Sequence, residues 1–329
     1  MSEQKTDLEK LIDNINKKLN TDIAQIKDLE TLSVQTIPSG SFTVDEALGV
    51  GGWPRGRIIE IYGPQAGGKT LLSLLAIAEA QKKGGLAAFI DVEHALDITW
   101  AKKLGVDVNN LYFVQPNYGE QALTIIEELA KTNKFDIIVL DSTAALVPKA
   151  ELEGELEDHQ IALQARMLSK ALRRALLSIG KGTATVIFIN QTRTNPMQMF
   201  GNPETTPGGE ALKFYSSLRV NVMRKGGSDI KEGGTVIGHR VRIKVTKNKV
   251  APPFKEAEFT IRYMTGVDRI DELATMAIDK GVIELRGPMY NFGDQKWQGR
   301  VNFITALFES ENLQKDIWEA IKNQTKSQI

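Results

Sequence analysis

The chain has 329 residues, of which 42% are hydrophobic, and this length and apolar content are typical of a folded protein of about two domains. Lys and Arg together number 41, as do Asp and Glu, so binding of a polyanion would have to come from local clusters of charge. The absence of cysteine excludes disulfides, thiolate metal sites and cysteine nucleophiles, and it agrees with a reducing cytosol.

The first residues of the sequence are mostly polar. They are too polar for a signal peptide, and no apolar run approaches a membrane span, so we expect a cytoplasmic protein without membrane attachment. An amphipathic helix is predicted there, with one apolar stripe formed by Leu8, Leu11, Ile12, Ile15 and Leu19. The stripe could pack on the protein's own core. It could instead contact a second subunit, because the segment from Asn20 to Gln35 resembles a polar tether.

From Arg57 onward, short apolar runs alternate with helical patterns. The predicted strands contain IIEIY, AAFID, LYFVQ, IIVLD and VIFIN, and the predicted helices include residues 70–83, 121–131 and 160–179. This alternation predicts an α/β fold with a mostly parallel central sheet and helices on both faces. The later runs LRVNVM, HRVRIKVT and AEFTIRY, broken by glycines near 225–227 and 233–234, are expected to extend the sheet with antiparallel strands.

After Thr265 the pattern changes to short helices around a hairpin near residues 291–296, which predicts a small α+β domain. We therefore expect an N-terminal oligomerisation helix and tether in residues 1–35, a core in 36–266 and a C-terminal domain in 267–329. Two connections, 146–160 and 192–210, lack clear periodicity although each follows a buried strand. Such long connections are usually functional or mobile, so both are candidate binding loops.

A GxxxxGK[ST] motif lies between a predicted strand and a predicted helix, which is the context that it requires. It comprises Gly63, Pro64, Gln65, Ala66, Gly67, Gly68, Lys69 and Thr70. The glycines let backbone N–H groups surround phosphates at a helix N-terminus, Lys69 reaches the β and γ oxygens, and the Thr70 hydroxyl ligates Mg²⁺. A chance match is expected in about 1 of 100 chains of this length, so the motif predicts an ATP and Mg²⁺ site.

Polar side chains follow the predicted strands at the edge where α/β sheets bind ligands. Asp141 ends IIVLD and is expected to be the metal-side carboxylate. Glu93 follows AAFID and is assigned to orient and deprotonate the attacking water, with Asp91 and His94 as competing neighbours. Gln191 follows VIFIN, where an amide can bond the γ-phosphate and report its loss to the next loop, which would make it a switch.

The helix expected at 160–179 has two different faces. Leu168, Leu172, Ala175 and Ile179 form an apolar face, opposite Arg166, Lys170 and Arg173 at i, i+4 and i+7. Such cations usually form a solvated surface. Here the helix directly follows a long loop, so its cationic face is also a candidate DNA contact.

The loop after Gln191 would expose apolar side chains. It carries Arg193, Met197, Met199 and Phe200 among glycines and prolines. The apolar groups could wedge between unstacked bases while the backbone of Gly208 and Gly209 holds phosphates, which suits single-stranded DNA. Met199 and Phe200 could also form a subunit contact, and the two uses are compatible.

The segments IYGPQAGGKT, IDVEHALD, MFGNPETTPGGEALKFY and KNKVAPPFKEAEF make the chain resemble the bacterial RecA recombinase family, from roughly Ser39 to the C-terminus. The last two segments are not general P-loop features. The resemblance implies a RecA-type P-loop ATPase core with two DNA-binding loops in residues 36–266. It weakly suggests that residues 267–329 capture duplex DNA, with candidates Lys280, Arg286, Lys296 and Arg300.

The resemblance also implies an activity. A protein of this family would form helical filaments on single-stranded DNA, pair it with homologous double-stranded DNA, and hydrolyse ATP in a DNA-dependent way in recombination and repair. It would also promote the self-cleavage of an SOS repressor. A hexameric helicase of the same fold is disfavoured by the C-terminal domain, and a nucleotide-gated signalling scaffold is the other alternative.

Individual roles follow from the same resemblance. Glu93 would be the catalytic base and Gln191 the γ-phosphate sensor. Lys247 and Lys249 of one protomer would reach phosphates held by the next, so that filament assembly becomes a condition for hydrolysis. Phe200 would insert into the neighbouring subunit. The implied nucleotide contacts beyond the motif are Leu71, Asp97, Trp100 and Tyr263, and the DNA contacts are Arg166, Ser169, Arg173, Arg193, Gly208 and Gly209.

Overall fold

The computed structural model describes residues 12, 14, 15, 17, 18, 34–155, 162–194 and 204–326. Residues 35–329 form one compact unit and residues 1–34 another. In the N-terminal unit, residues 12, 14, 15, 17 and 18 are helical, in agreement with the predicted helix, the rest of which lies outside the described residues.

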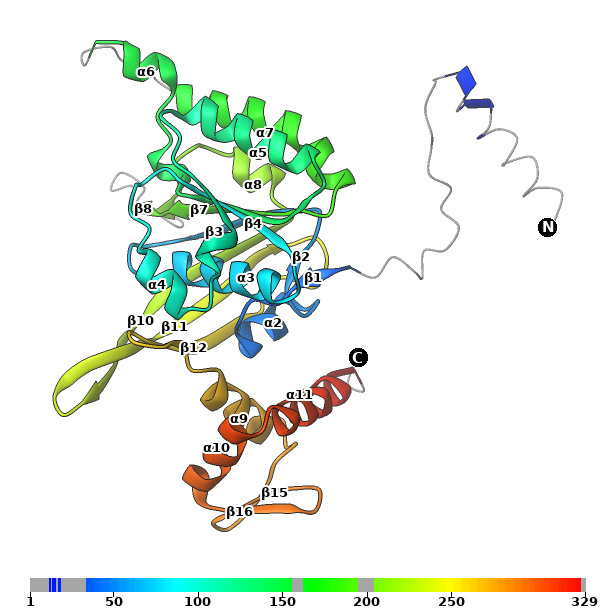
Figure 1. The fold of residues 1–329 in the computed structure, drawn as a ribbon, viewed down its shortest axis with the longest axis vertical. Helices are drawn as coiled ribbons and strands as arrows, with labels where there is room; N and C mark the ends of the chain where they lie inside the picture. Colours follow the sequence, from blue (N-terminus) through cyan, green and yellow to red (C-terminus); the bar gives the residue numbers. More distant parts are fainter. Residues whose placement is uncertain are drawn as a thin grey trace. The chain divides into compact units, whose positions relative to one another are not determined.

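A nine-stranded sheet forms the centre of residues 35–329, in the order β13-β12-β11-β10-β3-β7-β6-β4-β5 (Figure 1). Its first five strands along the chain are parallel: β3 (Ile58–Gly63), β4 (Leu86–Asp91), β5 (Leu111–Val114), β6 (Phe135–Asp141) and β7 (Thr185–Gln191). β3, β4, β6 and β7 are largely apolar and almost entirely buried, as expected for strands covered by helices on both faces. A short antiparallel pair, β1 (Thr36–Ile37) and β2 (Trp53–Pro54), precedes them.

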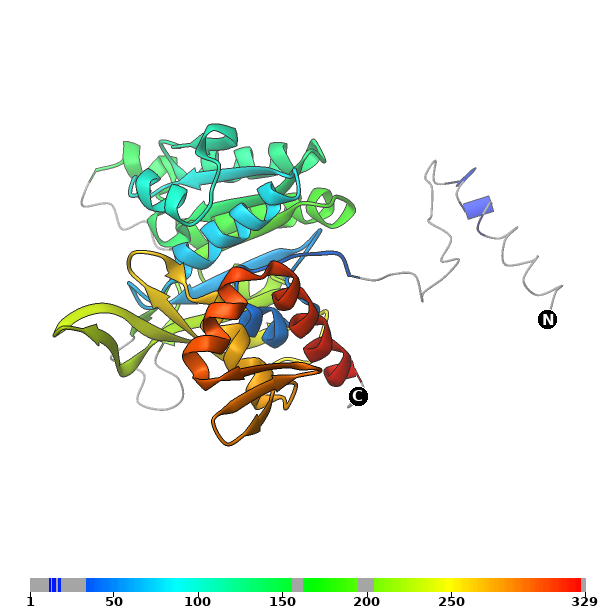
Figure 2. The same cartoon turned by 60° about the horizontal axis from the view of Figure 1, so that its bottom comes forward.

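The second half of the sheet departs in detail from the prediction. β10 (Leu218–Glu232) pairs parallel to β3, so the antiparallel extension begins only with β11 (Thr235–Asn248), β12 (Glu256–Arg262) and β13 (Gly266–Val267). The expected break at 225–227 is wrong. β10 continues through these residues, with a register shift between Arg224 and Asp229, and forms with β11 a long hairpin that projects from the sheet (Figures 1 and 2).

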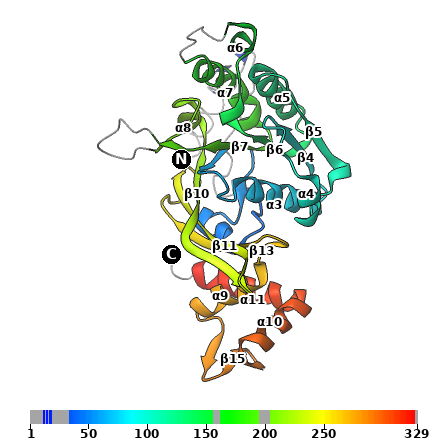
Figure 3. The same ribbon diagram turned by 90° about the vertical axis from the view of Figure 1, so that its left-hand side faces the viewer.

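Helices cover both faces of the sheet, as predicted (Figures 1 and 3). One face carries α2 (Phe42–Leu48), α3 (Lys69–Lys82) and α4 (Ile98–Lys103), and the other carries α5 (Gly119–Lys131), α7 (Leu163–Lys181) and α8 (Ala211–Tyr215). Because strand side chains alternate, Val139 belongs to the first hydrophobic cluster, whereas Ile138 and Leu140 belong to the second. Shorter elements are η2 (Val108–Asn110), η3 (Thr143–Ala145) and α6 (Lys149–Glu153), the last within the first predicted loop.

The C-terminal part has its own hydrophobic cluster. It contains α9 (Arg269–Asp279), β14 (Glu284–Arg286), β15 (Met289–Phe292), β16 (Gln295–Gln298), α10 (Gly299–Glu309) and α11 (Glu311–Lys326) (Figure 2). The three strands form a small antiparallel sheet, which confirms the predicted hairpin. Leu273, Phe303 and Ile317 pack here together with Phe42 of α2. The α/β fold with a small C-terminal α+β part is therefore confirmed, while the boundary at residue 267 stays a prediction.

None of the helices in the described part of the chain combines the length and apolar character needed to cross a bilayer.

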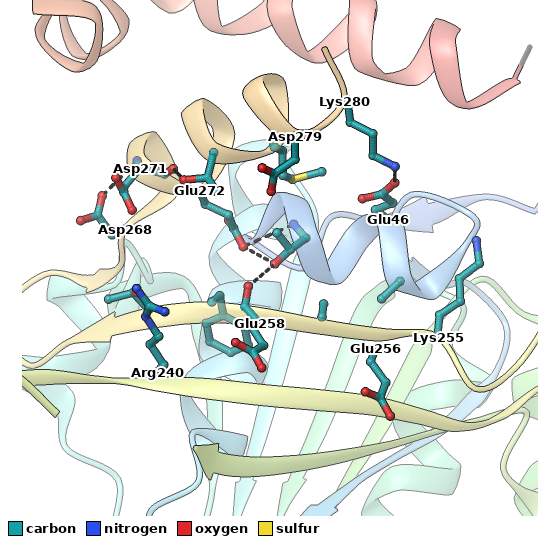
Figure 4. A pocket seen from close by; sticks show the side chains of 17 residues that line it. Glu46, Arg240, Lys255, Glu256, Glu258, Asp268, Asp271, Glu272, Asp279 and Lys280 are labelled. Atoms are coloured by element: carbon teal, nitrogen blue, oxygen red, sulfur yellow. Dashed lines mark hydrogen bonds and ion pairs between the residues drawn. The ribbon is translucent and has the colours of Figure 1, made fainter. Parts of the chain in front are cut away.

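A buried carboxylate joins α9 to the start of α2 (Figure 4). Glu272 accepts hydrogen bonds from Ser41 Oγ at 2.5 Å, from Phe42 N at 2.9 Å and from Thr43 N at 3.3 Å. Helical N–H groups in the first turn lack intrahelical partners, so this carboxylate caps α2 from outside. It borders a cleft of about 820 Å³ between α9 and β12 that is lined by many acidic side chains and by no residue of the GxxxxGK[ST] motif.

Asp45 is a second buried carboxyl group in α2. Its Oδ1 accepts from Ser39 N at 2.8 Å, yet burial raises its pKa from 3.8 to about 7. Because the pKa is higher in the folded chain than in the unfolded one, the neutral carboxyl stabilises the fold. That contribution is fully present below about pH 4 and is lost as the pH rises through about 7.

We expect Asp45→Asn, which keeps the acceptor but cannot ionise, to remove this pH dependence. The free energy of unfolding of the unaltered chain, relative to the variant, should fall by roughly 2–3 kcal/mol between about pH 5 and pH 7.5. Urea denaturation at several pH values measures it, with the exposed Asp316→Asn as a matched control. A difference that stays constant over this range would show that Asp45 ionises as freely in the folded chain as in the unfolded one.

Candidate functional site

The GxxxxGK[ST] motif connects β3 to α3, as predicted, and its backbone requires glycine. Gly63 and Gly68 have φ values of 153° and 98°, in the region that L side chains avoid. A Cβ on Gly63 would lie 2.1 Å from Val222 O, and one on Gly67 would lie 2.9 Å from the same oxygen. The loop therefore packs against β10 through its glycines.

The two polar side chains that end the motif are held by groups of the same site. Lys69 Nζ donates to Gly63 O at 3.0 Å and to Pro64 O at 2.6 Å. Burial lowers the pKa of Lys69, and the carboxylates of Asp141 and Glu93 oppose that shift. Thr70 Oγ1 donates to Asp141 Oδ2 at 2.7 Å. Hydroxyl and carboxylate oxygens are ligands that Mg²⁺ prefers, so this pair fits the metal that the motif implies.

Asp141 ends β6 in a buried position, 9% exposed. Burial raises its pKa from 3.8 to about 6, the Thr70 hydrogen bond and Lys69 lower it, and Glu93 and Asp91 raise it further. A nearby cation would return this carboxyl to its charged form, because an opposite charge favours ionisation. The electrostatics of Asp141 thus match a residue that acts together with a bound cation.

Glu93 and Gln191 meet at the carboxyl end of the sheet, as their strand-end positions predict. Gln191 Nε2 donates to Glu93 Oε1 at 2.8 Å, and Gln191 Oε1 lies 3.5 Å from Gln65 Nε2 of the motif. Ser142 Oγ also donates to Glu93 Oε1. Ser142 was missed in the sequence, although its position directly after Asp141 at a strand end is the signal that could have found it.

The two competitors of Glu93 have other surroundings. Asp91 accepts hydrogen bonds from Ala95 N and Leu96 N, each at 3.3 Å, and from Gln115 Nε2 at 3.3 Å, so it holds the turn after β4. His94 is exposed in the same turn with a φ of 54°. These contacts favour Glu93 over Asp91 as the group facing the site.

The residues predicted to contact the nucleotide outside the motif's loop lie on or beside three elements, α4, β12 and α3. Asp97 caps α4 by accepting from Trp100 N at 2.9 Å, and Trp100 packs partly buried on the first hydrophobic cluster. Tyr263 is 42% exposed and follows β12, whose Ile261 would contact a Cβ on Gly68 at 2.8 Å. β12 therefore ends beside the motif. The Leu71 side chain is buried in the core, so a nucleotide contact by this residue would use its backbone N–H.

The predicted cationic helix is α7, and its two faces are as predicted. Its buried face contains Leu168, Leu172, Ala175 and Ile179, all in the second hydrophobic cluster. Arg166, Lys170 and Arg173 are exposed, and Ser169 between them is partly buried.

The end of the second predicted loop packs on this helix. A Cβ on Gly208 would lie 2.3 Å from Leu168 Cδ1, and one on Gly209 would lie 3.1 Å from Ala165 Cβ. Both glycines have positive φ, 86° and 67°. The fold therefore brings the two predicted DNA-contacting elements together, and only glycine allows so close an approach.

The base of the same loop is a short hairpin of β8 (Arg193–Thr194) and β9 (Glu204–Thr205). Arg193 is exposed and lies two residues after Gln191. Asn195, Pro196, Met197, Met199 and the predicted subunit contact Phe200 lie outside the described residues.

Lys247 and Lys249 are not brought to the motif of their own chain. Lys247 of β11 lies opposite Arg219 of β10, and Arg219 lies opposite Glu60 of β3. Lys247 is therefore level with a residue of β3 that comes three positions before Gly63, the start of the motif. Lys247 Nζ donates instead to the carbonyls of Lys213 at 2.6 Å and Phe214 at 3.0 Å. A contact of these lysines with phosphates would therefore need a second copy of the chain.

Comparison with known proteins identifies the family of the chain. The family of the RecA N-terminal domain matches residues 6–268. Protein RecA of Macrococcus caseolyticus is 49% identical over 324 residues, which cover 98% of this chain and 91% of the relative. Protein RecA of Aquifex aeolicus is 49% identical over 98% of this chain and 93% of its own, and that of Heliobacterium modesticaldum is 51% identical over 90% and 85%. With the P-loop, the strand-end carboxylates and these relatives together, the chain belongs to the bacterial RecA family.

Proposed function

We propose that this protein is a DNA-dependent ATPase that forms helical filaments on single-stranded DNA and catalyses homologous pairing and strand exchange. Membership of the RecA family makes it a protein of DNA recombination and repair. The observation that carries the finer proposal is the 2.8 Å hydrogen bond between Glu93 and Gln191. It joins the carboxylate best positioned to activate water to the residue from which the second DNA loop departs.

ATP and Mg²⁺ are the proposed ligands of the motif. The backbone N–H groups of residues 63–70 would surround the phosphates, and Lys69 would exchange the carbonyls of Gly63 and Pro64 for phosphate oxygens. Thr70 and Asp141 would hold Mg²⁺, which neutralises charge that develops on the phosphates. Leu71, Asp97, Trp100 and Tyr263 complete the proposed nucleotide contacts.

Glu93 is the proposed base and Gln191 the proposed sensor. Gln191 and Ser142 both donate to Glu93 Oε1, so two donors already occupy the oxygen that would face an attacking water. Should the Gln191 amide turn to a γ-phosphate, Glu93 Oε1 would lose one donor and could accept a hydrogen bond from the water instead. Since Gln191 stands next to the β8–β9 hairpin, the same movement would reach the DNA loop.

The DNA site is proposed on α7 and the loop ends beside it. Arg166, Ser169, Arg173 and Arg193 would contact the backbone of single-stranded DNA together with the N–H groups of Gly208 and Gly209. Contacts to the phosphate backbone carry little sequence preference, as a recombinase requires.

The position of Lys247 near the end of β11 and of Lys249 directly after this strand supports the proposal of filament formation. Lys247 and Lys249 would complete the ATP site of an adjacent protomer, which ties hydrolysis to assembly. Phe200 and the N-terminal helix are further proposed subunit contacts. Promotion of SOS repressor self-cleavage and a cytoplasmic location rest on the family alone.

Capture of double-stranded DNA by the C-terminal part has weaker support. Three of its four candidate cations form ion pairs within the chain, Lys280 with Glu46, Arg286 with Glu284, and Arg300 with Asp271. Each of these three cations would have to leave its carboxylate partner before it could bind a DNA phosphate.

Replacing Glu93 by Gln should separate binding from hydrolysis. We expect Glu93→Gln to bind ATP and single-stranded DNA with affinities within about threefold of the unaltered chain, and to hydrolyse ATP at least about 100-fold more slowly. Steady-state phosphate release measures the turnover. The exposed Glu128→Gln on α5 is the matched control and should retain full turnover. Hydrolysis by Glu93→Gln at a near-normal rate would assign the base elsewhere.

Replacing Arg173 by Ala should weaken DNA binding through one phosphate contact. We expect the slope of log Kd against log salt concentration to fall by about 1, with ATP affinity unchanged. Arg174→Ala is the control, because Arg174 forms an ion pair with Glu127 of α5 at 3.2 Å, whereas Arg173 Nε only donates to the neutral Tyr215 hydroxyl at 3.4 Å. Equal slopes in the two variants, or a joint loss of ATP affinity, would contradict the assignment of the face.

The proposed action of Lys247 on a neighbouring protomer can be tested by mixing. Lys69→Ala and Lys247→Ala should each hydrolyse almost no ATP alone. In mixed filaments, about a quarter of the interfaces would join an intact P-loop to an intact Lys247, so activity should partly return. If the mixture stays inactive although the two variants assemble together, Lys247 does not act between protomers.

A further inference from the structure

Buried polar side chains link the second DNA loop to the centre of the sheet. Glu60 of β3 and Asn190 of β7 are both 0% exposed. Asn190 Nδ2 donates to Glu60 Oε1 at 3.0 Å and to Pro207 O at 3.2 Å, while its Oδ1 accepts from Gln191 N at 3.0 Å. One amide group thus holds the backbone of the proposed sensor, the end of the DNA loop and a buried carboxylate.

The carboxylate is itself fixed from the next strand. Arg219 Nε of β10 donates to Glu60 Oε2 at 2.5 Å, and its guanidinium lies 4.5 Å from the centre of the Tyr62 ring. Tyr62 OH lies 2.9 Å from Thr246 Oγ1, next to Lys247 on β11. The chain of contacts therefore continues from the DNA loop to the strand that carries the proposed subunit-facing lysine.

Stability alone gives no reason for such a group in this place. Glu60 interrupts a strand whose neighbours Ile59 and Ile61 are fully buried, and removing a carboxylate from water costs several kcal/mol before its pairing is counted. Apolar side chains of similar volume are often as stable in the place of a buried ion pair. The Glu60–Arg219 ion pair has a further consequence here. It holds Glu60 in place, and Glu60 Oε1 in turn fixes the orientation of the Asn190 amide by accepting from its Nδ2.

The Asn190 amide is rigid and planar, and it is hydrogen-bonded to Gln191, Pro207 and Glu60. A movement of one of these three residues therefore affects the other two. If the backbone of Gln191 shifts, Asn190 must either lose a bond or move Pro207 or Glu60 with it. Pro207 directly precedes Gly208 and Gly209, whose backbone is proposed to hold DNA.

We propose that Asn190, oriented by the Glu60–Arg219 ion pair, is the positioning residue that couples occupation of the nucleotide site to the backbone conformation of Pro207 to Gly209, at the described end of the second DNA loop. This inference rests on the proposed function, since it assumes that the loop binds DNA and that ATP strengthens the binding. Asn190 contacts neither ligand and acts through Gln191 and Pro207.

The test is the coupling ratio: the Kd for a single-stranded oligonucleotide without nucleotide, divided by its Kd with a non-hydrolysable ATP analogue. Asn190→Ala should lower this ratio at least about tenfold toward 1, while the affinities for the analogue alone and for DNA alone stay within about threefold. The same ratio must be obtained from the analogue affinity with and without DNA, because coupling is reciprocal.

Two further variants make the result specific. Glu60→Gln keeps the size of the side chain but removes the charge that faces Arg219, and it should lower the ratio in the same direction. If Asn190→Ala does not fold, the coupling ratio of Glu60→Gln tests the inference in its place. Asn221→Ala is the control: Asn221 is a buried asparagine on β10 whose Oδ1 has no hydrogen-bond partner among the described residues, and its loss should leave the ratio unchanged.

The outcomes separate the inference from the function on which it rests. A large ratio in the unaltered chain that persists in Asn190→Ala and Glu60→Gln would overturn the inference and leave the proposed function standing. Loss of both separate affinities with an intact ratio would also overturn it, because Asn190 would then be only structural. A ratio of 1 in the unaltered chain would overturn the proposed function itself.

Discussion

The hydrogen bond between Gln191 and Glu93 is the contact on which the other proposed parts depend. Oε1 of Glu93 accepts hydrogen bonds from both Gln191 Nε2 and Ser142 Oγ, so the orientation of the Gln191 amide decides whether this oxygen has one donor or two. The next described elements along the chain, β8 and β9, form the base of the proposed second DNA loop. The proposed sensor therefore lies directly before the proposed DNA loop in the chain.

Parallel strands make this meeting of side chains possible. Gly63 and Gln191 are paired residues at the ends of β3 and β7, and Asp91 and Asp141 are paired at the ends of β4 and β6. Because all four strands run in one direction, the motif, the sensor and the carboxylates share one edge of the sheet. β11 runs in the opposite direction, so Lys247 near its end lies away from that edge.

Local sequence patterns predicted most of the residues at the candidate site. They could not predict the features that depend on the pairing of strands far apart in the sequence. The motif specifies its own loop, and the apolar runs fix which residues end strands, so Lys69, Thr70, Glu93, Asp141 and Gln191 could be found in the sequence. The parallel pairing of β10 with β3 could not, because strand direction is set by the crossover through α8. Glu60 was visible as a charge inside IIEIY, but its partners Asn190 and Arg219 lie 130 and 159 residues away, on strands that become neighbours only in the fold.

In the proposed function, the nucleotide site depends on DNA and on a second copy of the chain. This dependence is tested most directly by measuring ATP hydrolysis at several protein concentrations, with and without a single-stranded oligonucleotide. If phosphates are held between protomers whose DNA groove is filled, turnover per chain should rise steeply with concentration, and by at least about tenfold when the oligonucleotide is added. Equal turnover by dilute monomers in the presence and absence of DNA would show that this dependence does not exist.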